Sequence, residues 1–168
     1  MYVGYLDMDY EQIEEEYGDA IRRVAASYAP PGAARDDLEQ EIALAIYEAL
    51  PKFRDESSIK TYVYRIAQNC GIDRIRKRRL DRVELDQGQT PDRSGATPEE
   101  HAVRRDQYER LAAAIRQLPL KLRQPLVLRL EELTYDEIAD VLGISNSNVG
   151  VRIHRAKAAL KEMLEEAE

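Results

Sequence analysis

The stretch from Leu133 to Leu164, LTYDEIADVLGISNSNVGVRIHRAKAALKEML, predicts a helix, a tight turn and a second helix. Gly143 stands where the first helix must end with a positive φ, and Ser145 is a residue type that caps helices. Apolar residues then recur at three- and four-residue spacing, as a buried helix face requires: Val149, Ile153, Ala156, Leu160 and Met163. This arrangement is typical of helix-turn-helix units that read DNA.

The other positions of the second helix carry polar and basic side chains that suit the major groove of DNA. Arginine pairs bidentately with guanine, asparagine pairs with adenine, and both contact phosphates. The predicted DNA-reading residues are Ser145, Asn146, Ser147, Asn148, Arg152 and Arg155. The alternative is an ordinary helical hairpin with a solvated polar face. The Gly-Ile-Ser turn and the uncompensated basic positions argue against this alternative.

The charge of the chain limits how it can bind DNA. Its formal net charge is −7, so the average field repels phosphate and only local patches, such as the run from Arg74 to Arg82, attract it. We therefore expect a partner to supply affinity. No apolar run is long enough to span a bilayer, and the acidic N-terminus is unlike a signal peptide, so we expect a cytoplasmic protein without membrane insertion.

The apolar periodicity predicts an all-α fold of two small helical domains joined by a flexible linker. The expected domains are residues 1–83 and 105–168, with residues 84–104 as the linker, because Gly, Pro, Ser and Thr replace periodic apolar residues there. The expected helices before the helix-turn-helix run from about 10 to 28, 36 to 50, 57 to 82, 99 to 117 and 122 to 131. Pro125 fits the last of these only in its first turn.

The end of the first domain combines aromatic and basic residues beyond what a helix core needs. Aromatic rings offer stacking surfaces for exposed bases, and basic side chains hold the backbone of opened DNA. The residues concerned are Tyr62, Tyr64, Arg65, Asn69, Asp73, Arg74, Arg76, Lys77 and Arg78. A solvated basic helix end with a half-buried Tyr62 explains the composition equally well, and spacing alone does not decide between the two.

Nothing in the sequence points to catalysis. His101 and His154 lack a partnered nucleophile or metal-ligand spacing, Cys70 is the only cysteine, and no glycine-rich phosphate loop is present. We therefore expect a protein that is not an enzyme, with no catalytic residue, no metal, no cofactor and no small-molecule substrate.

Three motifs in a fixed order carry a resemblance to a known family. They are Asp37-Leu38-Glu39-Gln40-Glu41; Phe53-Arg54 with Ser57 and Tyr64-Arg65-Ile66-Ala67-Gln68-Asn69; and Tyr135-Asp136-Glu137-Ile138-Ala139 with Leu142-Gly143-Ile144-Ser145. With these motifs, the chain resembles a bacterial RNA polymerase sigma factor of the extracytoplasmic-function type, in the sigma-70 family, over nearly its whole length. Sigma factors of this type keep only regions two and four of the family. The resemblance implies that the expected domains are region two and region four.

The resemblance also implies partners and roles. Core RNA polymerase would be bound through its β′ clamp, by Asp37, Leu38, Gln40 and Glu41, and through its β flap. The −10 promoter element would be melted and read by Phe53, Arg54, Ser57, Tyr62, Tyr64, Arg65, Asn69, Arg74, Arg76 and Lys77. The −35 element would be read by the six residues of the helix-turn-helix, and an anti-sigma factor is a further partner that the family admits.

The chain departs from the family pattern at three positions. Tyr62 stands where the family often has Trp, Asn148 replaces a usual Thr, and Gly150 replaces a usual Lys or polar residue. Gly inside a helix costs about 1 kcal/mol relative to Ala, which indicates close backbone approach to DNA or a locally weaker helix. Two alternatives remain open: a stand-alone two-domain helix-turn-helix regulator, and an interaction protein that has lost promoter activity.

Overall fold

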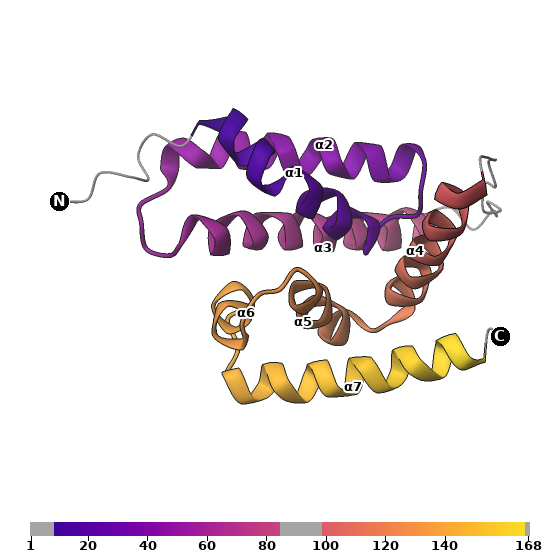
Figure 1. Ribbon diagram of the computed structural model, residues 1–168. Helices are drawn as coiled ribbons and strands as arrows, with labels where there is room; N and C mark the ends of the chain where they lie inside the picture. The colour runs from indigo at the N-terminus through magenta and orange to yellow at the C-terminus, as the bar shows by residue number, and fades with distance from the viewer. Residues whose placement is uncertain (1–8, 85–98, 167–168) are drawn as a thin grey trace.

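The computed structural model describes residues 9–84 and 99–166, and these ranges are helical without any strand. The helices are α1 (Tyr10–Ala26), α2 (Ala33–Ala49), the 3-10 turn η1 (Leu50–Lys52), α3 (Ile59–Glu84), α4 (Glu99–Gln117), α5 (Leu120–Leu130), α6 (Tyr135–Leu142) and α7 (Asn146–Glu165). Helices α1 to α3 form one layer and α4 to α7 lie against it (Figure 1). The predicted all-α fold is confirmed.

The first three helices share one apolar core. Helix α2 buries Leu38, Ile42 and Ile46 completely, and α1 and α3 close over them with apolar side chains from their facing sides. The close approach of α3 to the end of α1 depends on Gly71, because a Cβ there would lie 2.4 Å from the ring of Tyr28. Tyr28 is buried and hydrogen-bonds to the buried Gln68 side chain, which fixes the ring over Gly71.

The last four helices form the second unit, in which α7 packs along α5 and α6. Gly143 ends α6 in the left-handed conformation with φ 65°, as the sequence predicts. The predicted stripe of α7 is buried at Val149, Ile153 and Ala156, whereas Leu160 and Met163 are half-buried. The helix-turn-helix at this end of the chain is therefore confirmed.

The two units are packed together, which the sequence did not indicate. Helix α6 lies against α3, where the Lys60 ammonium is 3.1 Å from the Glu137 carboxylate and Arg65 donates to the carbonyl of Asp140 at 2.7 Å. At the other side of the contact, Arg35 of α2 makes a bidentate ion pair with Glu109 of α4. These contacts hold the units in a closed arrangement.

Several boundaries differ from the sequence-based expectation. Helix α2 begins at Ala33, three residues earlier than expected, and α5 begins at Leu120. The expectation for Pro125 was wrong: it lies inside α5, where it is buried and removes one backbone donor from the helix. Residues 99–104 of the expected linker belong to α4, and residues 85–98 lie outside the described part of the chain.

Candidate nucleic-acid interface

The N-terminal end of α7 presents most of the predicted DNA-reading residues to solvent. Ser145 caps the helix by accepting a hydrogen bond from the Asn148 backbone N–H at 3.2 Å. The Arg152 side chain donates to the Asn148 carboxamide oxygen at 3.1 Å, so these two neighbours on the helix act as one polar unit. The exposed members of the set are Ser145, Asn146, Ser147, Asn148 and Arg155. Asn146 is tethered, because its amide donates to Asp136 of α6 at 2.5 Å.

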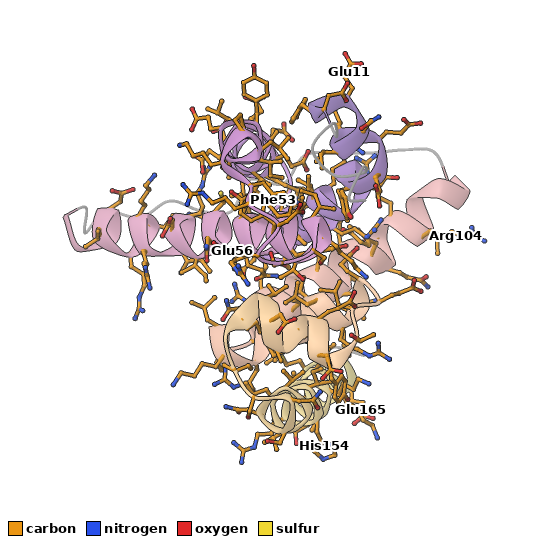
Figure 2. All side chains as sticks on the ribbon, turned by 90° about the vertical axis from the view of Figure 1, so that its left-hand side faces the viewer. Glu11, Phe53, Glu56, Arg104, His154 and Glu165 are labelled. Carbon is orange, nitrogen blue, oxygen red and sulfur yellow. The ribbon has the colours of Figure 1, made fainter. Side chains whose placement is uncertain are left out.

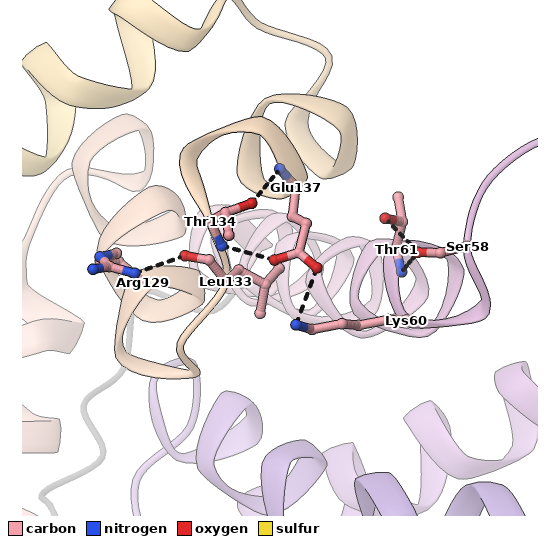
Figure 3. A network of polar contacts seen from close by, with 7 residues as sticks. All are labelled: Ser58, Lys60, Thr61, Arg129, Leu133, Thr134 and Glu137. Carbon is pink, nitrogen blue, oxygen red and sulfur yellow. Dashed lines mark hydrogen bonds and ion pairs between the residues drawn. The ribbon is translucent and has the colours of Figure 1, made fainter.

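The capping box of α6 fixes the first helix of this unit. The Thr134 hydroxyl accepts from the Glu137 backbone N–H, and the Glu137 carboxylate accepts from the Thr134 backbone N–H at 2.7 Å (Figure 3). The hydrogen bond from the Thr134 backbone lowers the pKa of Glu137, and the contact with Lys60 lowers it further. One carboxylate thereby caps α6 and also joins it to α3.

Gly150 faces the Tyr135 ring of α6. A Cβ at this position would lie 3.4 Å from Cε2 of that ring, which is an ordinary van der Waals contact, and the ring in turn lies under the Arg129 guanidinium. The packing of α7 against α6 therefore leaves room for a Cβ at position 150 and does not explain the glycine.

The loop before α3 and the first turns of α3 form the second predicted DNA surface. The rings of Phe53 and Tyr62 lie 5.0 Å apart and tilted, and the Tyr62 hydroxyl donates to the Ala49 carbonyl at 3.1 Å. Arg54 and Asn69 are exposed, and Ser57 is half-buried. Phe53 and Glu56 are labelled on this loop in Figure 2. An aromatic pair beside exposed polar groups is a suitable platform for an unstacked base.

Tyr64 lies away from this surface. Its side chain is 5% exposed, its ring meets Tyr17 of α1 edge to face at 6.2 Å, and burial raises the pKa of its hydroxyl. On α3, residues 62, 65 and 69 follow helical spacing along one side, whereas position 64 falls on the side that packs against α1. The structure therefore separates Tyr64 from the other predicted −10 residues.

The basic residues of α3 divide into free and paired groups. Arg76 and Lys77 are exposed, and Arg76 has only a long contact of 3.8 Å to Asp73. Arg74 is instead held against α2: its Nη1 is 2.8 Å from Glu41, and its Nη2 donates to the Ala34 carbonyl at 3.0 Å. Arg74 thus links the predicted DNA surface to the predicted polymerase surface and organises α2 against α3.

The outer face of α2 carries more than the sequence motif indicates. Leu38 is fully buried in the core, so only Asp37, Gln40 and Glu41 of the predicted set reach the surface. Beside them lie Leu44, which is 57% exposed, and Tyr47, which is 61% exposed. Sequence reasoning missed both, although they continue the spacing of the exposed positions and fall outside the Leu38–Ile42–Ile46 stripe.

The described residues contain no group of three or more acidic, histidine or cysteine side chains that could hold a metal ion. Within the same residues, no helix has the length and apolar content needed to cross a membrane. The candidate binding surfaces are the polar surfaces on α3 and α7 and the outer face of α2. A helix-turn-helix with an exposed polar and basic face is typical of DNA-binding proteins.

Comparison with known proteins defines the class further. The family model for sigma-70 region 2 matches residues 14–80, and that for sigma-70 region 4 matches residues 108–160. The ECF RNA polymerase sigma factor SigW of Bacillus subtilis is 30% identical over 92% of this chain and 88% of its own length. The RNA polymerase sigma factor CnrH of Cupriavidus metallidurans is 29% identical over 93% of this chain and 86% of its own.

Solved structures agree with these relatives. The structure of CnrH in complex with the cytosolic domain of CnrY matches 95% of this chain and 89% of its own, with 26% identity and a TM-score of 0.68. The sigma factor RpoE from Bartonella quintana, crystallised with the anti-sigma factor NepR, shares the fold over 93% of this chain and 96% of its own, at 20% identity and a TM-score of 0.71.

The chain belongs to the sigma-70 family of RNA polymerase sigma factors, in the extracytoplasmic-function type. It binds core RNA polymerase and directs transcription initiation from specific promoters. The family is not known for enzymatic activity.

Proposed function

We propose that the two polar surfaces divide promoter recognition between them. The loop of residues 53–58 with Tyr62, Arg65 and Asn69 takes the −10 element, and the N-terminal half of α7 takes the −35 element. The observation that carries this proposal is that each matched region presents its own exposed polar surface above a closed apolar core. Arg76 and Lys77 hold backbone phosphates, because they are exposed and make no short ion pair with any other described residue.

Core polymerase binds to the outer face of α2 in this proposal. Asp37, Gln40 and Glu41 supply acidic and polar groups, and Leu44 and Tyr47 supply apolar area that is otherwise left in water. Exposed aromatic and aliphatic side chains surrounded by polar groups are typical of protein interfaces. The polymerase then contributes the positive charge that a chain of net charge −7 lacks.

Promoter binding requires the closed arrangement to open. The Arg65 guanidinium, assigned to the −10 element, is taken up by the Asp140 carbonyl of α6, and Lys60 beside it is paired with Glu137. The −10 surface is thus partly covered by the unit that reads the −35 element. Separation of α6 from α3 releases Arg65 and lets the two units reach separate promoter elements.

The protein acts by binding and performs no catalytic step of its own, in the cytoplasm where polymerase and promoters are found. An anti-sigma factor regulates it. This part of the proposal is supported by two solved structures of similar proteins, RpoE bound to the anti-sigma factor NepR and CnrH bound to the cytosolic domain of CnrY.

Transcription in vitro with purified core polymerase tests the assignment of α2. We expect Leu44→Asp with Tyr47→Asp to abolish run-off transcripts and co-elution with core polymerase. Val103→Asp on α4 is the matched control, because Val103 is 58% exposed and lies far along the chain from α2. Equal activity of both variants would remove α2 as the polymerase surface.

The same assay separates the sigma factor from a stand-alone regulator. A sigma factor directs initiation only when core polymerase is present and gives no specific promoter complex without it. A specific duplex complex formed by the chain alone, unaffected by core polymerase, would instead support the regulator.

A further inference from the structure

One pocket of this molecule gathers several positively charged side chains. It has a volume of ≈ 330 Å³ and lies where the C-terminal part of α3 meets α4 and α5. Four arginines line it, namely Arg78, Arg79, Arg116 and Arg123, together with Tyr28 and Ile75. Among the described residues no carboxylate lines it, although the whole chain has net charge −7.

Arg123 forms the floor of this pocket, which we name the arginine pocket. Arg123 is only 7% exposed, and its guanidinium carbon lies 5.7 Å from the centroid of the Tyr28 ring. Its terminal nitrogens donate to backbone carbonyls, including Leu118 at 2.9 Å, while its buried Nε has no hydrogen-bond partner in the described structure. Burial lowers the pKa of Arg123, because the charged form is taken out of water without a carboxylate to compensate it.

The other three arginines are equally without a carboxylate. Among the described residues, no ion pair involves Arg78, Arg79 or Arg116, and Arg116 donates instead to the Ala26 carbonyl at 2.7 Å. The nearby Glu109 is already paired with Arg35 in a bidentate contact. Burial and then the charge of Arg35 lower the pKa of Arg116, whereas Glu109 raises it.

We propose that the arginine pocket binds an anion bearing phosphate groups. Guanidinium groups match phosphate oxygens in geometry and in charge, and a partly enclosed site strengthens each such contact. Arg116 and Arg123 are held in place by backbone carbonyls, and Arg78 and Arg79 are exposed arms that close on the ligand. A di- or triphosphate group fits the number of arginines, whether it belongs to a free small molecule or to the backbone of DNA.

The position of the pocket gives such an anion a structural consequence. Tyr28, Ile75, Arg78 and Arg79 belong to the first unit, whereas Arg116 and Arg123 belong to the second. An anion that contacts both pairs of arginines stabilises the closed arrangement. This inference does not depend on the assignment of the promoter surfaces, because binding is measured with the protein alone.

Thermal unfolding with sodium tripolyphosphate as the probe tests the proposal, at ionic strength matched with sodium chloride. Selective binding to the folded state raises Tm with the logarithm of the probe concentration, by roughly 5–10 °C at one hundred times Kd. Sodium chloride alone at the same ionic strength is the reference. A Tm that does not differ between the two salts would overturn the proposal.

A matched pair of variants locates the site. Arg78→Ala with Arg79→Ala removes two pocket charges, and Arg104→Ala with Arg105→Ala removes two exposed charges of α4 that do not line the pocket. We expect the first variant to weaken tripolyphosphate binding by roughly 10-fold or more and the second to leave it nearly unchanged. Equal weakening by both would show general electrostatic attraction and overturn the pocket.

A second set of titrations identifies the source of the phosphate. Fluorescence anisotropy with a labelled duplex of arbitrary sequence, without polymerase, is compared with calorimetric titration of tripolyphosphate and ATP. Loss of duplex binding in Arg78→Ala with Arg79→Ala, together with loss of the heat from tripolyphosphate, assigns the pocket to DNA phosphates. Heat from the small probes that this variant loses, with unchanged duplex binding, assigns it to a free anion.

Discussion

Arg23 of α1 and Glu131, the residue that ends α5, form a fork-to-fork ion pair in which both N–O distances are 2.8 Å. Glu131 has a side chain only 5% exposed, whereas that of Arg23 is 49% exposed. The hydrogen bond to Glu131 raises the pKa of Arg23, and burial together with the Glu131 charge raises the pKa of Tyr64. The two units of this sigma factor are therefore joined by a charged contact whose acidic half is buried.

Glu131→Gln tests the contribution of this contact. Glutamine keeps the shape but removes the charge, so we expect a loss of about 1–2 kcal/mol in the free energy of unfolding, since half of the Arg23 side chain is in water. Urea denaturation measures the loss. The adjacent Glu132→Gln is the control, because Glu132 is exposed and has no ion pair in the described structure. An equal loss in both variants would contradict a specific role for Glu131.

The two glycines inside helices of the first unit are expected to respond oppositely to alanine. Gly71→Ala brings a Cβ to 2.4 Å from the buried Tyr28 ring, which costs about 1–3 kcal/mol of stability. Gly18→Ala meets only Glu14 Cγ at 3.7 Å, so helix propensity makes it stabilising by up to about 1 kcal/mol. Thermal unfolding measures both effects: Tm should fall in Gly71→Ala and rise in Gly18→Ala. A Gly71→Ala protein as stable as the wild type would show that Tyr28 can leave its position freely.

The helix-turn-helix was accessible from sequence because local rules determine it. The position of Gly143, the cap at Ser145 and the spacing of Val149, Ile153 and Ala156 each depend on neighbours within one or two turns. The same rules predicted every described α-helix, although α5 was expected to begin later, with Pro125 in its first turn, and the 3-10 helix η1 was not predicted. Whether a buried helix can continue through a proline depends on tertiary packing, and a local sequence pattern gives no information about that packing.

The contacts between the two units were not accessible in this way. Arginine is usually a surface residue, so the burial of Arg35 and Arg123 gives no sequence signal. Arg35 pairs with Glu109, which is 74 residues further along the chain. Arg123 lies over the ring of Tyr28, which belongs to the other unit. Tyr64 could have been separated from Tyr62 by the helical period, since two residues place it on another side of α3.

The stability of the closed arrangement should depend on pH through Glu109. The hydrogen bonds from Arg35 lower the pKa of Glu109 below its ordinary 4.5, so its contribution is complete above that value and is lost as the pH falls through the lowered pKa. Near neutral pH we expect Glu109→Gln to cost about 2 kcal/mol, because Arg35 is buried. Urea denaturation across the acid range measures both proteins.

The difference between wild type and Glu109→Gln should shrink as the pH falls below 4.5 and vanish once the carboxyl is protonated. Glu48→Gln, an exposed position with no ion pair in the described structure, is the control and should show no such convergence. A constant difference at all pH values would mean that the side chain contributes by packing alone.

Asn148 should determine sequence preference at the −35 element. Its amide can pair with adenine in the major groove, and its oxygen holds Arg152 at 3.1 Å. We expect Asn148→Ala to change which −35 sequences are used, with a loss of about 1–3 kcal/mol at the preferred one. Transcription by the holoenzyme from a promoter library with a randomised −35 element measures the change.

Arg76→Ala gives the contrasting result in the same library. A phosphate contact carries no sequence information, so its loss should weaken all promoters by a similar factor and reduce the dependence on salt.

Because Asn148 also positions Arg152, Asn148→Ser, which keeps an oxygen near Arg152, should retain more of the original preference than Asn148→Ala. If Asn148→Ala weakened every promoter equally, Asn148 would be a positioning residue of α7 and the reading of the −35 element would lie with Arg152 and Arg155.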